Sequence, residues 1–253
     1  MTGLLWAELR RFGVRPAIRW IAAGMLVHVA LAVALTAYEV NASTLAALLE
    51  QDDISFYAMT SVFLAFVAGV LLVTGDAASG ATRAVLTVEP RRGRVYWTKV
   101  AAAGLAVLPG VAAAYALLAL GMYAVHARAG VLGDPGSDLA LELTWSGVRV
   151  LALAACAAAG GAALGVLLRR WWVAVLLVVG WFLIEETALS TAFRLRDWLM
   201  FANAAGWVRG TRSVPPGEGI LAVPLVHSGL VLLGLTAVLT VFGWVVFRRR
   251  DVL

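Results

Sequence analysis

Two adjacent carboxylates, Glu185 and Glu186, stand near the end of a long apolar segment of this chain. A helix rises about 1.5 Å per residue, so Glu185 lies roughly 21 Å above Trp171, within a hydrocarbon core of about 30 Å. Acids at that depth are unfavourable unless they are paired, hydrated or protonated, and Arg149 and Arg194 are candidate partners. The pair therefore fits either a polar wall of a path through a membrane or, if the apolar span ends before it, two acids in water at the outer mouth.

Hydrolytic chemistry is the rival interpretation of the same two glutamates. Intramembrane proteases of the prenyl-peptide (CAAX) type begin their catalytic motif with two glutamates and place an arginine four residues after the second. Ser190 occupies that place here, and Arg194 lies a full turn further on. Their metal site also needs histidines, but His126 is expected in an outer loop, and His28 and His227 as packed or hydrogen-bonded residues of a bundle. The metal-dependent protease therefore stays the alternative.

The sequence does not provide for ATP hydrolysis by this chain alone. A phosphate-binding loop needs a Gly-Lys-Ser/Thr run, whereas Lys99 is the only lysine and no such run occurs. Cys156 is the only cysteine, so neither a disulfide framework nor a paired-thiol metal site is expected. We expect no catalytic residue, metal or cofactor in the chain, and we predict that it is not an enzyme.

The stretch 74–99 joins two long apolar segments and is short and basic, so it is expected to face the cytoplasm. A short helix is predicted over 81–88, and Pro90 is expected to end it because proline disfavours a helical Glu89. Four apolar residues share one side of that helix: Ala81, Ala84, Val85 and Val88. Such a helix, held against the inner face of a membrane, would suit a cytosolic partner.

Cations and aromatic residues follow the proline. They are expected at the level of the lipid headgroups and at the start of the next span, respectively. The cations are Arg91, Arg92 and Arg94, and the aromatic belt is the pair Tyr96 and Trp97.

This segment resembles the region after the second span of the ABC type 2 exporter permeases. The family pattern there is an acid, a Gly-Thr pair, a charged residue, a leucine-rich turn, a proline, basic residues and a lysine. The residues that fill these places are Asp76, Gly80, Arg83, Leu86, Pro90, Arg91, Arg92, Arg94 and Lys99, with Asp76 standing where glutamate is usual. The tail 247–252 also resembles the C-terminal signature of the family.

The resemblance implies a membrane permease that works with a separate cytosolic ATP-binding-cassette ATPase and with a second permease copy or a related permease. It further implies that the segment from Asp76 to Arg94, together with the N-terminal helix, docks the ATPase. A re-entrant helical segment before the last span is implied as well. In this view Glu185, Glu186 and Arg149 would belong to the translocation path.

Composition points to the same class of protein. The chain has 253 residues, of which 62% are hydrophobic, and its mean hydropathy is +0.90. These values predict an all-α polytopic membrane protein with a single domain over 1–253. Six segments are long enough to cross a bilayer, at about 20–38, 54–75, 100–125, 145–168, 171–190 and 220–247.

The N-terminal region is predicted to form an interfacial helix over 1–18, ended by Pro16. Leu5, Leu9 and Phe12 line one helical face, while the arginines of this region are expected elsewhere on the helix. Small residues dominate the fourth span, and Gly161 and Gly165 form a Gly-x-x-x-Gly pair. That pair favours close helix packing within the bundle over a contact between subunits.

The distribution of charges along the chain predicts its orientation in the membrane. With both termini in the cytoplasm, the inner regions carry fourteen cations and four acids, and the outer regions carry six cations and eleven acids. The inside is then +10 and the outside −5, as the positive-inside rule requires. We therefore expect a multi-pass protein of the plasma membrane that binds the lipid bilayer and no nucleic acid.

Overall fold

The computed structural model describes residues 2–39, 53–130, 138–191, 197–210 and 223–249. In these residues the chain is helical throughout and contains no strand. This confirms the prediction of an all-α fold. The helices are α1 (Thr2–Val14), α2 (Pro16–Glu39), α4 (Asp53–Ala78), α5 (Ala81–Val88), α6 (Arg92–Ala129), α7 (Asp138–Leu168), α8 (Trp171–Thr191), α9 (Met200–Arg209) and α10 (Leu225–Arg249).

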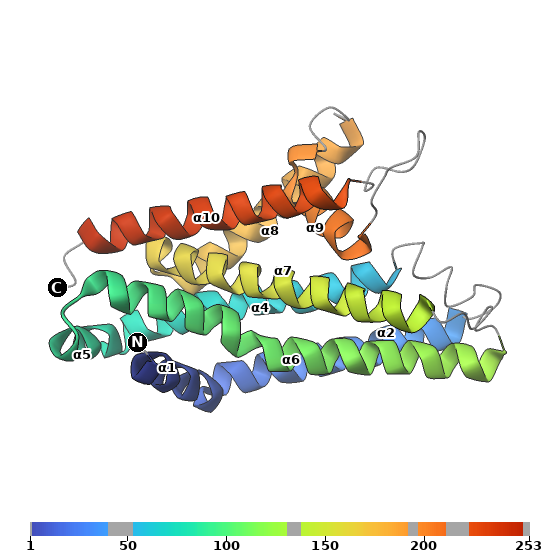
Figure 1. Cartoon of the computed structure of the whole chain (residues 1–253), viewed down its shortest axis with the longest axis horizontal. Coiled ribbons are helices and arrows are strands. Elements are labelled where there is room, and N and C mark those ends of the chain that lie inside the picture. Colours follow the sequence, from blue (N-terminus) through green and yellow to red (C-terminus); the bar gives the residue numbers. More distant parts are fainter. Residues whose placement is uncertain (1, 40–52, 131–137, 192–196, 211–222, 250–253) are drawn as a thin grey trace.

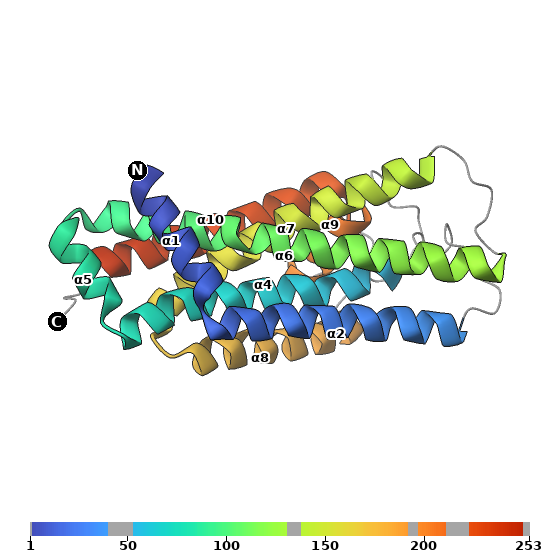
Figure 2. The ribbon, with the colours of Figure 1, turned by 90° about the horizontal axis from the view of Figure 1, so that it is seen from below.

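The long helices run side by side along the long axis of the molecule (Figures 1 and 2). At one end of the bundle lie α5, the short helix α1, which crosses the bundle obliquely, and the last turn of α10. The short helix α9 lies beside α10 further along the bundle. The described parts of both terminal helices are therefore at the same end of the molecule as α5.

The centre of the bundle is a close seam between α4 and α7. Ala154, Ala158 and Ala162 of α7 are fully buried. A Cβ added at Gly161 would overlap the carbonyl of Phe66, and one added at Gly165 would lie 3.1 Å from the carbonyl of Val70. The prediction that the small residues of the fourth span pack within the bundle is confirmed, because they let two helix backbones touch.

A methyl group added at this seam is expected to be destabilising. Gly161→Ala should lower the free energy of unfolding by about 1–3 kcal/mol, because α4 and α7 must move apart to admit it. Gly160→Ala is the matched control, since its Cβ would meet only the side chain of Leu239 at 3.7 Å. The control should be neutral or gain up to about 1 kcal/mol from helix propensity. Equal melting temperatures of the two purified variants in detergent would contradict close packing of α4 and α7 at Gly161.

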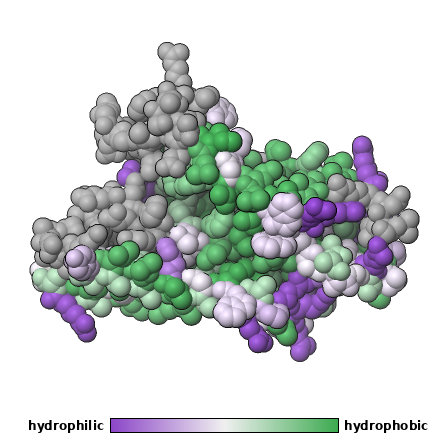
Figure 3. All heavy atoms as spheres, turned by 180° about the vertical axis from the view of Figure 1, so that it is seen from behind, coloured by the Kyte–Doolittle hydropathy of each residue, from purple (hydrophilic) through white to green (hydrophobic). Residues whose placement is uncertain are grey.

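The outer surface of the bundle is apolar across its middle, and hydrophilic residues gather toward the end that carries α5 (Figure 3). Leu26, Val27 and Leu31 of α2 and Leu230 and Leu233 of α10 are at least half exposed. Within the residues that the structure describes, five helices, α2, α4, α6, α7 and α10, are long and apolar enough to cross a membrane. The chain is therefore a multi-pass membrane protein.

The sixth expected span corresponds to α8. In α8 the apolar stretch within the described side chains is shorter, Trp171–Glu185. The count of six spans stays a prediction.

Some boundaries differ from those expected. The N-terminal helix ends at Val14, and α2 begins at Pro16, because proline is tolerated in the first turn of a helix. The third span begins at Arg92 and runs for 38 residues with Pro109 inside it. It therefore includes His126, which is fully buried with Nδ1 2.7 Å from the carbonyl oxygen of Met122. The expectation of His126 in an outer loop was wrong, since the helix continues past the last apolar run.

Candidate functional site

A cluster of buried ions lies where α1, α4 and α6 meet, directly before and after α5. Glu8 comes from α1, Asp76 from the last turn of α4, and Lys99 from the second turn of α6. Their exposed fractions are 2%, 0% and 3%. Charges this deeply buried are maintained only when they are paired and hydrogen-bonded.

Lys99 joins the two acids. Its Nζ donates to Oε1 of Glu8 at 3.0 Å and also to Oδ2 of Asp76. The only lysine of the chain thus connects the N-terminal helix to the end of α4.

Two arginines of the N-terminal region complete the cluster. Arg15 donates to Oδ1 of Asp76 and to the carbonyls of Leu72 at 2.8 Å and Leu71 at 3.3 Å. It therefore contacts carbonyls in the last two turns of α4, where a cation also complements the helix dipole. Arg11 lies 3.3 Å from Oδ1 of Asp76 and 3.7 Å from Oε1 of Glu8.

Charge is not balanced in this cluster. Three cations meet two acids, so the group carries one net positive charge. Asp76 contacts all three cations, and it is the centre of the group. The contacts link α1, α4 and α6 at a single point. A displacement of any one of these helices must therefore break or stretch its ion pairs with the other two.

The segment between Asp76 and Lys99 forms the bend that carries α5. Gly80 caps the N-terminus of α5 with φ +71°, a left-handed conformation that suits glycine. Glu89 is extended after the last turn, as expected before a proline. Arg94 Nη1 then lies 3.0 Å from Oε2 of Glu89, which closes the bend onto the start of α6.

The helix predicted over 81–88 is confirmed. Thr82 is the buried residue, and Ala81, Val85 and Leu86 are half-buried. The outward face consists of Arg83, Ala84, Thr87 and Val88, and Val88 is 87% exposed. The apolar residues Ala84 and Val88 thus lie on the outside, because α5 packs against α4 and α6 through the side that carries Thr82.

The other residues predicted for the site lie outside the ion cluster. Arg83, Pro90 and Arg91 are exposed, whereas Arg92 Nη1 approaches the carbonyl of Arg248 at 3.5 Å. Tyr96 was expected in an aromatic belt, and this was wrong. It is 1% exposed, and its hydroxyl donates to the carbonyl of Thr240 at 2.6 Å, because α10 covers this turn of α6.

Comparison of the chain with protein-family models and with curated proteins finds no match.

The second candidate region is α9, which is held at both ends. The carboxylate of Glu185 is 1% exposed and accepts hydrogen bonds from the backbone N–H groups of Met200 and Phe201, both at 2.7 Å. An acid in this position satisfies the free amides at a helix N-terminus. At the other end, Arg149 donates to the carbonyls of Val208 at 3.3 Å and Arg209 at 3.2 Å.

Glu185 and Arg149, which were predicted as partners, therefore hold opposite ends of α9. Glu185 also accepts a hydrogen bond from Nε1 of Trp181. The side chain of Glu186 lies outside the described part of the structure, as does Arg194. A role for Glu185, Glu186 or Arg149 in a translocation path stays a prediction.

His227 lies in α10 with Nε2 2.7 Å from the carbonyl oxygen of Asp197, and its ring stands edge-on to Trp198. This confirms the expectation of a hydrogen-bonded residue. In the described part of the chain, no three His, Cys, Asp or Glu side chains form a group that could hold a metal ion.

Sequence reasoning missed Glu8, Arg11 and Arg15 as members of the site. The signal was their spacing: residues 8, 11 and 15 recur at three and four positions, so they share a helical face with the buried Phe12. The apolar face Leu5, Leu9 and Phe12 was predicted, but the arginines were only expected elsewhere on the helix, and no face was predicted for Glu8.

Proposed function

We propose that this chain is the membrane-spanning permease subunit of an ATP-binding-cassette exporter and couples to a separate cytosolic ATPase. The observation that carries the proposal is the placement of α5. It is held between a glycine turn and a proline at one end of the bundle, its outward face is uncovered, and buried ion pairs flank it in the chain. A docking helix needs this combination of an accessible face and a firm connection to the spans.

In this proposal the α5 end of the bundle faces the cytoplasm of the plasma membrane, with both termini on that side. The basic residues at this end favour that orientation. Two copies of the chain, or this chain and a related permease, would enclose the path and bind two ATPase subunits. Transport would be alternating access driven by nucleotide binding on the partner.

The ion cluster gives the route by which the ATPase would act on the spans. Asp76 precedes α5 by five residues and Lys99 follows it by eleven, and the two side chains are paired. A force on α5 therefore reaches α4 and α6 together. Glu8, paired with Lys99, adds the N-terminal helix to the same unit.

Charge reversal on the exposed side of this segment tests the proposal. Arg83→Glu with Arg91→Glu should weaken association with the ATPase about tenfold, while membrane insertion is unchanged. Both changes are combined because single exposed ion pairs contribute only about 0–1 kcal/mol. The measurement is the amount of P-loop ATPase that copurifies with the chain from native membranes in mild detergent.

The matched control is Arg19→Glu with Arg249→Glu, which reverses the same number of charges at exposed positions on α2 and α10. It should retain the ATPase. The proposal fails if the unmodified chain copurifies with no ATPase or if both double variants lose it equally. Chelator-sensitive proteolysis by the purified chain would favour the intramembrane protease instead.

A further inference from the structure

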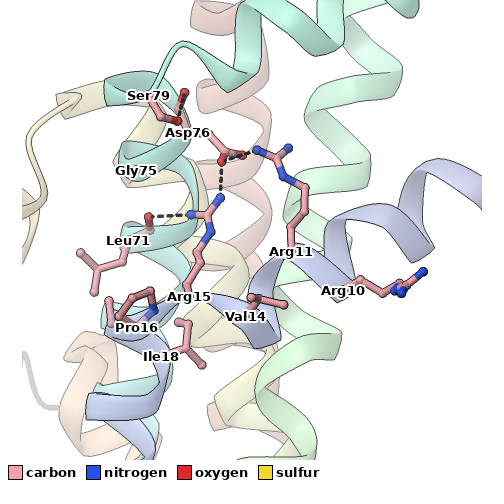
Figure 4. A pocket seen from close by; sticks show the side chains of 11 residues that line it. Arg10, Arg11, Val14, Arg15, Pro16, Ile18, Leu71, Gly75, Asp76 and Ser79 are labelled. Carbon is pink, nitrogen blue, oxygen red and sulfur yellow. Dashed lines mark hydrogen bonds and ion pairs between the residues drawn. The ribbon is translucent and has the colours of Figure 1, made fainter.

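An open groove of about 710 Å³ lies beside the ion cluster, between the end of α1, the start of α2 and the last turns of α4 (Figure 4). Its apolar lining includes Val14, Ile18 and Leu71. Its polar lining includes Arg10, Arg11, Arg15 and Ser79. One elongated site thus joins an apolar surface to a group of cations.

The groove carries more positive charge than its own acids neutralise. Among the described residues, Asp76 is the only acid that lines it. Asp76 is fully buried and already contacts Arg11, Arg15 and Lys99. Arg10 points away from Asp76 in Figure 4. The side chains of Arg11 and Arg15 are 39% and 21% exposed. A guanidinium has five N–H donors, so both arginines retain donors for a ligand in the groove.

The groove lining at Pro16 and Ala17 continues onto the outer surface of α2, because Pro16, Trp20, Val27 and Leu31 are spaced by four, seven and four positions and share one face of the helix. Trp20 is 78% exposed, Val27 69% and Leu31 55%, all on this membrane-crossing helix. A ligand that fills the groove would place its anionic group at the arginines and an apolar chain along α2. A small soluble anion would contact the arginines alone and leave the apolar lining uncovered.

We propose that the groove binds one anionic phospholipid, with its headgroup phosphate at Arg10, Arg11 and Arg15 and an acyl chain against Pro16, Ala17 and the outer face of α2. Basic sites between membrane helices on the cytoplasmic side are suited to anionic headgroups. The lipid neutralises the surplus charge of the ion cluster and so becomes part of the contact between α1 and α4. This inference needs only the membrane-spanning bundle and is independent of the proposed transport function.

Lipid retention by the purified full chain tests the inference. Native mass spectrometry in detergent should show one bound phosphatidylglycerol per chain and none with phosphatidylcholine of the same acyl chains. Arg10→Gln with Arg11→Gln should weaken phosphatidylglycerol binding about 25-fold, since each of the two cations near an anionic lipid contributes about a factor of five. The matched control, Arg169→Gln with Arg170→Gln, removes the same charge from exposed positions outside this groove and should bind as the unmodified chain does.

A second variant tests the shape of the site without changing its charge. Ala17 is exposed and lines the groove, so Ala17→Trp should fill it and reduce lipid retention while the fold is kept. Size-exclusion chromatography confirms that each variant is folded. Equal losses in the two arginine pairs, full retention in Ala17→Trp, or equally tight binding of glycerol phosphate would each overturn the proposal.

Discussion

Lys99→Met is expected to lower the free energy of unfolding by about 3–5 kcal/mol, because it leaves two buried acids without their shared cation. The side chain of Lys99 is 4% exposed and contacts both Glu8 and Asp76. Methionine keeps most of the volume of lysine, so the loss reports charge pairing more than packing. The measurement is the thermal or denaturant midpoint of the purified chain in detergent.

Two further variants make this prediction specific. Arg91→Met removes an exposed cation at the same end of the molecule and should change stability by less than about 0.5 kcal/mol. Lys99→Met combined with Asp76→Asn should be less destabilising than the sum of the two single changes, because the residues form one network. Strict additivity, or a Lys99→Met protein as stable as the unmodified chain, would show that the cluster does not hold the helices together.

Glu185→Ala is expected to cost about 3 kcal/mol, because the backbone N–H groups of Met200 and Phe201 lose a charged acceptor in a buried place. Glu185→Gln should lower the free energy of unfolding by less than Glu185→Ala does, since an amide oxygen still accepts a hydrogen bond but carries no charge. Amide hydrogen exchange should rise in α9 more than in the neighbouring α10. This readout separates a local loosening of α9 from a general loss of stability.

The control for this change is Ile184→Ala. Ile184 is 62% exposed on the same helix, so its truncation should leave the exchange of α9 unchanged. If Glu185→Ala leaves the amides of 200 and 201 as protected as before, the carboxylate does not cap α9. An effect of Glu185→Gln on transport, with α9 still protected, would instead support a place for this acid in the translocation path.

Features that depend on local chain chemistry were predictable from the sequence. The bounds of α5 follow from Gly80 and Pro90, which stop a helix by conformational preference and by the missing N–H group. The close packing of the fourth span follows from Gly161 and Gly165, since only small side chains permit such contact.

Features that depend on which elements meet were not predictable in the same way. Nothing in the order of residues brings Glu8 to Lys99, ninety-one positions later. Glu185 was found by its type and depth, but its partners are backbone amides, which leave no mark on the sequence. Tyr96 was misjudged for the same reason, because the helix that covers it, α10, is more than a hundred residues away.

The close seam between α4 and α7 has a mechanical consequence. Two helices whose backbones touch cannot slide or bend independently, so they move as one rigid body. With 31 residues, α7 is about 46 Å long. A tilt of about 5° at the end near Asp76 therefore shifts the far end by about 4 Å. Arg149 lies on α7 nineteen residues, about 28 Å, from the end near Asp76 and binds the last carbonyls of α9. The same tilt therefore displaces the end of α9 by about 2.5 Å.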